Sequence, residues 1–154
     1  MHHASCLAGL AFSNAGLGLN HGMAHTLGAH FHIPHGRANG ILLPYVMAFN
    51  AGCHEQLTPV AARYARIARV LRLDGPSIRQ SAFSVVRTIK QYMKQLHIPD
   101  SIEAAGVSRE DFDAVLDEMV EAAYQDACTK TNPRACSKED IRGVFLRAYT
   151  GRLI

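Results

Sequence analysis

The 154-residue chain is long enough for one domain with a sizeable core, and its 48% hydrophobic and 19% charged residues are ordinary for a globular protein. It contains no uninterrupted apolar run of the roughly 18 residues that a membrane span needs. Its start lacks the basic segment and apolar core of a signal peptide, so we expect a cytoplasmic protein. The four cysteines form no CxxC pair, and we expect free buried thiols.

The net charge of +3 is spread unevenly along the chain. Residues 58–97 hold eight Lys or Arg and one acid, whereas residues 100–126 hold nine Asp or Glu and one Arg. The preferred interpretation is neighbouring helices of opposite charge that face one another, or charged faces that are simply solvated. The alternative is nucleic-acid binding through the stripe of Arg63, Arg66, Arg69 and Arg72, which predicts affinity that falls steeply with salt. We expect no nucleic-acid partner.

The first half of the chain predicts three helical segments. Residues 4–19 are rich in Ala, Gly, Ser and Leu, and Leu7, Leu10 and Phe12 fit a buried helix. We expect a second helix to end at Gly28, with residues 29–34 as a loop. Residues 39–50 are too apolar for a surface helix and read as a central, buried one, distorted early by Pro44 or beginning near it.

The second half carries clear helix start signals. Thr58 precedes a proline, Pro76 opens the next helix, and Ser108 and Ser137 each have an Asp three residues later, as in a capping box. Residues 129–135 form a polar, turn-rich loop. Because no segment shows strand alternation, we predict an all-α domain of about six to eight helices.

The segment from Asn20 to Asn39 holds five of the nine histidines, and the first acidic residue of the chain is Glu55. His21 and His25 are four residues apart, so on a helix they share one face. Such a cluster predicts metal binding or catalysis. Any carboxylate ligand must come from far along the chain or from outside it.

Two hydrolytic interpretations fail on the residues. The zinc-protease motif needs a Glu directly after its first His, and Gly22 stands there. No serine lies in a GxSxG elbow. A non-catalytic helical interaction module, in which the histidines are structural, remains the alternative function.

Residues 11–39, AFSNAGLGLNHGMAHTLGAHFHIPHGRAN, resemble the second signature of the iron-dependent (group III) alcohol dehydrogenases. Residues 129–141, TKTNPRACSKEDI, are similar to the closing segment of that family. The resemblance covers the whole chain. It implies that residues 1–154 are the C-terminal, metal-binding helical domain of a two-domain dehydrogenase.

The resemblance also implies roles for single residues. His21 and His35 match two metal ligands of the family, and His25 matches a catalytic histidine that positions the substrate or cofactor or relays a proton. The expected metal is Fe²⁺, with Zn²⁺ as the alternative. His30 and His32 are expected to be structural or to support the site, and His2 and His3 match no ligand position.

The rest of the expected enzyme lies outside the sequence. An Asp and a His ligand, and the Rossmann-like domain that binds NAD or NADP, precede the matching region in the family. The resemblance therefore implies a metal-dependent oxidation of alcohols or reduction of aldehydes by the intact enzyme. We expect the chain by itself to be inactive and to bind metal weakly. It could form a homo-oligomer, because the surface that meets the cofactor domain would be exposed.

Overall fold

The computed structural model describes residues 1–53 and 55–153. Across these residues the chain forms seven α-helices, one 3₁₀ helix and no β-strand, which confirms the all-α prediction. The helices are α1 (His2–Ala15), α2 (Gly18–Phe31), α3 (His35–Ala51), α4 (Pro59–Val70), α5 (Ile78–Gln95), α6 (Arg109–Gln125), the 3₁₀ helix η1 (Thr129–Thr131) and α7 (Lys138–Thr150).

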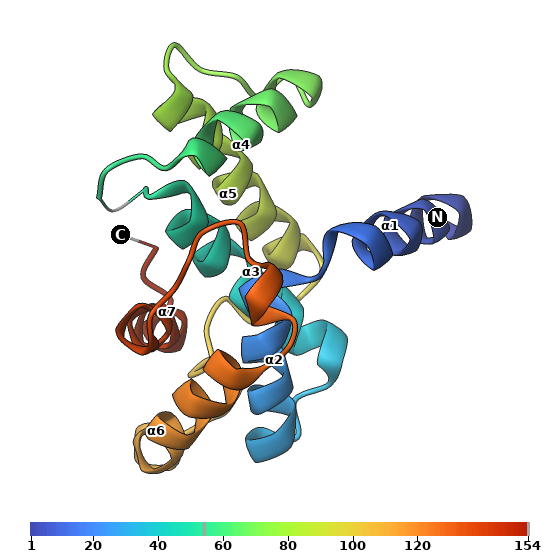
Figure 1. The fold of residues 1–154 in the computed structure, drawn as a ribbon. Helices are drawn as coiled ribbons and strands as arrows, with labels where there is room; N and C mark the ends of the chain where they lie inside the picture. The colour runs from blue at the N-terminus through green and yellow to red at the C-terminus, as the bar shows by residue number, and fades with distance from the viewer. Residues whose placement is uncertain (54, 154) are drawn as a thin grey trace.

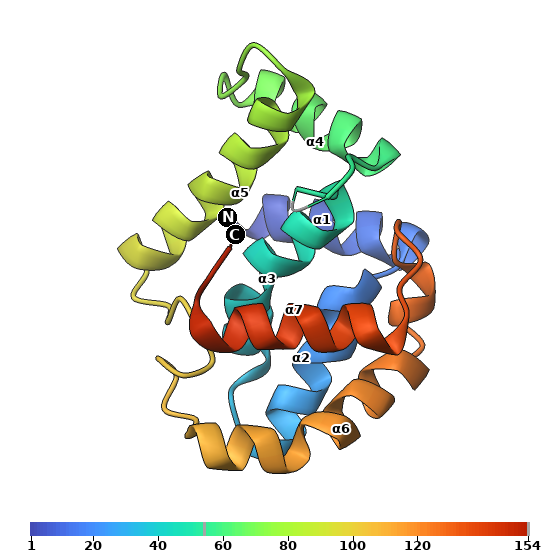
Figure 2. The ribbon, with the colours of Figure 1, turned by 90° about the vertical axis from the view of Figure 1, so that its left-hand side faces the viewer.

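Helix α3 is the central element of the fold. Buried residues along its length, from Ile41 to Phe49, belong to the main core, to which α2, α6 and α7 also contribute. Met47 and Ala48 of the same helix pack instead in a smaller cluster with α4 and α5. Figures 1 and 2 show this arrangement, with α4 and α5 at one end of the molecule and α2, α6 and α7 at the other. The prediction of a central, buried helix is therefore confirmed.

The local signals place most helix starts correctly. The Thr58 side chain accepts a hydrogen bond from the amide of Val60, and the Ser108 side chain accepts one from that of Asp111. Ser137 and Asp140 form a complete capping box. In contrast to these helices, α2 has no capping side chain from its own N-cap residue, Leu17.

The predicted boundaries between α2 and α3 were wrong. Helix α2 continues past Gly28 to Phe31, because the residue that takes the left-handed conformation is His32, at φ 53°. The amide of His32 then bonds to the Gly28 carbonyl. Helix α3 begins at His35 instead of Asn39, with Pro34 as its N-cap residue, and Pro44 lies inside the helix. The loop that joins α2 to α3 is therefore only three residues long, residues 32–34.

The prediction that the first helix is buried was also wrong. Helix α1 contains no buried residue, and it extends away from the other helices (Figure 1). Leu7, Leu10 and Phe12 are 67%, 61% and 47% exposed. Within the described residues, no helix has the length and apolar character needed to cross a membrane.

Candidate metal centre

Three of the five clustered histidines come together in space. Helix α2 carries His21 and His25 one turn apart, and the short loop brings His35, the first residue of α3, beside them. The ring centroids of His21 and His35 are 5.3 Å apart, those of His25 and His35 5.5 Å, and those of His21 and His25 6.2 Å. The structure thus groups the two predicted ligands and the predicted catalytic histidine.

His21 has an unused polar atom. Among the described residues, its Nδ1 is buried and has no hydrogen-bond partner. Burial, followed by the neighbouring His35 and His25, lowers the pKa of His21, although Asp126 and the backbone of Leu17 act in the opposite direction. A neutral imidazole is the form that binds a metal. The environment of His21 therefore favours the ligating form.

Asparagines fix the position of His35. The side chain of Asn39 lies one turn further along α3, with its Nδ2 3.2 Å from His35 Nε2 and 3.0 Å from the His35 carbonyl. Asn20 of α2 donates to the Asn39 side-chain oxygen at 2.8 Å. This bond joins the helix that carries His21 to the helix that carries His35.

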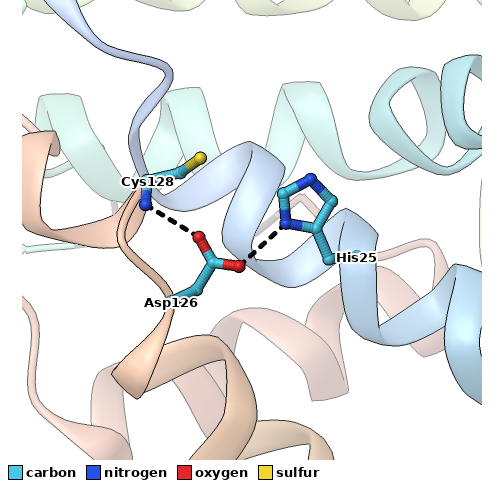
Figure 3. A group of neighbouring side chains, drawn as sticks. All are labelled: His25, Asp126 and Cys128. Atoms are coloured by element: carbon cyan, nitrogen blue, oxygen red, sulfur yellow. Dashed lines mark hydrogen bonds and ion pairs between the residues drawn. The ribbon is translucent and has the colours of Figure 1, made fainter.

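His25 contacts a carboxylate from far along the chain. Its Nδ1 lies 2.8 Å from Oδ2 of Asp126, which is the C-cap residue of α6, as Figure 3 shows. The other oxygen, Oδ1, accepts the Cys128 amide at 2.7 Å. Burial alone would raise the pKa of Asp126, but these two hydrogen bonds lower it below its usual value. Burial, together with Asp126, raises the pKa of the Cys128 thiol.

The spacing of the rings suits a metal ion shared by two imidazoles. With metal–nitrogen bonds of about 2.1 Å, two imidazoles on one ion have centroids roughly 5 Å apart. His21 and His35 are close to that separation and have the shortest distance of the three pairs. His25 is instead held toward Asp126. His21 and His35 are thus the better pair for a shared ion, and they leave further coordination positions open.

The remaining histidines of the segment lie elsewhere. His32 is exposed at the end of α2, and the His30 ring lies beside Phe31. His2 and His3 are on the exposed helix α1. Sequence reasoning missed Asp126 and Cys128 as members of the site. The available signal was their place directly before the closing segment, at residues 129–141, that resembles the family.

Comparison with known proteins identifies the family. Residues 1–149 match the family described as "Fe-containing alcohol dehydrogenase family, C-terminal". The chain is 42% identical over 151 residues to the NADPH-dependent butanol dehydrogenase of Clostridium saccharobutylicum, covering 98% of this chain and 37% of that protein. It is 39% identical over 145 residues to lactaldehyde reductase of Escherichia coli K12, covering 93% of this chain and 35% of that protein.

Solved structures agree with the sequence comparisons. The iron-containing alcohol dehydrogenase of Thermococcus thioreducens superposes with a TM-score of 0.82 at 36% identity, over 98% of this chain and 36% of that one. A 1,3-propanediol oxidoreductase also gives 0.82, at 32% identity, over 95% of this chain and 36% of that one. The chain spans little more than a third of the length of these relatives. It therefore belongs to the Fe-containing alcohol dehydrogenase family and corresponds to its C-terminal helical part.

Proposed function

We propose that this chain supplies His21 and His35 as two ligands of a catalytic metal in an NAD(P)-linked alcohol dehydrogenase. The convergence of these rings, with the buried and unpartnered Nδ1 of His21, is the observation that carries the proposal. A structural histidine in a non-catalytic module would be expected to use its buried nitrogen in a hydrogen bond. The expected metal is Fe²⁺, with Zn²⁺ as the alternative, and a second domain would supply further ligands and bind NAD or NADP.

When bound, the metal would polarise the substrate oxygen as a Lewis acid, and the nicotinamide would exchange a hydride with the substrate. The residues of this chain would position the histidines that take part. Asn39, which donates to the His35 carbonyl, and Asn20, which donates to Asn39, join the start of α3 to α2 and so keep His35 beside His21. Asp126 holds His25 by Nδ1, which fixes the ring and leaves Nε2 as the nitrogen able to exchange a proton with solvent or substrate. His25 thus serves as the proposed catalytic residue.

A domain fusion tests the proposal directly. We would join this chain to the upstream part of the C. saccharobutylicum butanol dehydrogenase, which is 42% identical in the matching region. Loaded with Fe²⁺ in the absence of zinc, the fusion is expected to hold close to one iron per chain and to oxidise butanol with NADP. His21→Ala and His35→Ala should each lose metal and activity. His25→Ala should keep the metal and lose about 10²- to 10⁴-fold in kcat, the range for a proton-transfer group.

Matched histidine variants from the same segment serve as controls. His30→Ala and His32→Ala should keep both metal content and turnover, because neither ring belongs to the cluster. Elemental analysis and steady-state kinetics provide the two readouts. Full iron content in a His21→Ala/His35→Ala double variant, loaded with Fe²⁺ in the absence of zinc, would refute the ligand assignment. The unfused chain should show no alcohol turnover with NAD or NADP.

A further inference from the structure

A second set of metal-binding atoms lies beside the three imidazoles. A ring nitrogen of His25, a carboxylate oxygen of Asp126 and the sulfur of Cys128 all lie within 4.8 Å of one another. His25 comes from α2, whereas Asp126 and Cys128 come from the turn between α6 and η1 (Figure 3). Neither His21 nor His35 belongs to this group. One nitrogen, one oxygen and one sulfur donor therefore converge on a small, partly exposed volume.

The combination of donors selects a class of metal. Imidazole nitrogen, thiolate sulfur and carboxylate oxygen together are ligands of Zn²⁺, at about 2.1, 2.3 and 2.1 Å. Hard ions such as Mg²⁺ and Ca²⁺ take oxygen ligands instead. In a tetrahedral site with these bond lengths the donor atoms are roughly 3.5 Å apart. The donor atoms of this group lie within 4.8 Å of one another, so rotation of the side chains would bring them to that spacing.

The turn that carries two of the donors is already fixed. Asp126 Oδ1 accepts the Cys128 amide at 2.7 Å, which leaves Oδ2 directed at His25. The Thr129 amide bonds to the Asp126 carbonyl, and the buried Thr129 hydroxyl donates to the Ala123 carbonyl at 2.7 Å. Hydrogen bonds of this kind orient a ligating carboxylate and raise metal affinity. Little ordering would therefore remain to be done when a metal binds.

We propose that His25, Asp126 and Cys128 form a binding site for a thiophilic divalent cation, Zn²⁺, which this chain assembles by itself. Binding releases the thiol proton of Cys128 to solvent, and the fourth position stays open to water. If the proposed function also holds, zinc at this site competes with the catalytic role of His25. Zinc would then inhibit the dehydrogenase without replacing the metal on His21 and His35.

Cobalt(II) provides the test, because a cobalt–thiolate bond gives a charge-transfer band in the near ultraviolet. The protein is the full 154-residue chain carrying Cys6→Ser, which removes the exposed thiol one helical turn from His2. Titration with cobalt should produce the band, and equimolar zinc should abolish it. Cys128→Ser and His25→Ala should lose the band, and Asp126→Asn should weaken cobalt binding at least about tenfold.

Two variants separate this site from other thiols and from the His21 and His35 pair. Cys136→Ser removes another partly buried thiol and should keep the band. The His21→Ala/His35→Ala double variant should also keep it, whatever the outcome of the domain fusion. Far-ultraviolet circular dichroism verifies that each variant is folded. No band in the parent, a band that survives Cys128→Ser, or a band lost in the double variant would each overturn the proposal.

Discussion

Gly22 lies between His21 and His25, on the side of α2 that meets α6 and η1. A Cβ atom at this position would lie 2.1 Å from the Thr129 hydroxyl and 3.3 Å from the Ala123 carbonyl. Thr129 is buried and bonded to Ala123, so it cannot move aside easily. We expect Gly22→Ala to lower the free energy of unfolding by about 1–3 kcal/mol, the usual cost of overpacking. Urea denaturation monitored by circular dichroism measures this change in the free energy of unfolding.

Gly28 of the same helix is the matched control. Its added Cβ would meet only the Ile33 carbonyl, at an ordinary 3.6 Å. Because alanine has the higher helix propensity, Gly28→Ala should leave stability unchanged or raise it by up to about 1 kcal/mol. Equal destabilisation by both substitutions would indicate that the close contact of Gly22 is not the cause.

The four-residue spacing of His21 and His25 on one helix predicted that these two lie side by side, because their relation is local. His35 was expected at the site only through the family resemblance, and the structure brings it there because α3 begins at His35, after the three-residue loop that follows α2. Asp126 is 101 residues from His25, and no local pattern connects the two. Only the packing of α6 against α2 brings them together, so charge and spacing alone left the carboxylate unidentified.

At the scale of elements, α2 depends on side chains from the far end of the chain. The Thr131 hydroxyl accepts the amide of Gly18, and the Asn132 side-chain oxygen accepts that of Leu19, both at 3.1 Å. The Asn132 amide donates to Asn50 of α3 and to the Arg134 carbonyl, both at 2.7 Å. The first two of these contacts provide acceptors for backbone amides in the first turn of α2, which has no capping side chain from its own N-cap residue. Sequence reasoning placed Asn132 in a turn and could not show this long-range cap.

Replacing Asn132 tests that role. Asn132→Ala removes the acceptor of the Leu19 amide and leaves the part-buried Asn50 amide without its partner. We expect a loss of about 1–3 kcal/mol in the free energy of unfolding. Asn14→Ala, on the exposed face of α1, removes only a bond to the Leu10 carbonyl of the same helix and should change stability by less than about 0.5 kcal/mol. Thermal denaturation of both variants compares them, and equal losses would contradict the capping role.

The whole molecule consists of a packed body and one projecting helix. Helix α1 has 14 residues, no side-chain cap and no buried residue. A helix of that length is marginal in water when nothing packs against it. The sequence predicted a buried α1 because its apolar residues share one face of a helix. The same pattern does not show whether another part of the chain covers that face. Leu7, Leu10 and Phe12 therefore offer an exposed apolar surface to a partner.

A second copy of the chain is the partner available to the purified protein, so we expect concentration-dependent self-association through α1. The weight-average mass from sedimentation should rise with concentration. Leu7→Ser should reduce this rise without changing the stability of the body, because Leu7 contributes nothing to the core. Leu96, at the end of α5, is 69% exposed against 67% for Leu7, so Leu96→Ser is the matched control and should associate like the parent. A strictly monomeric parent, or equal effects of both serines, would show that the apolar face of α1 does not drive association.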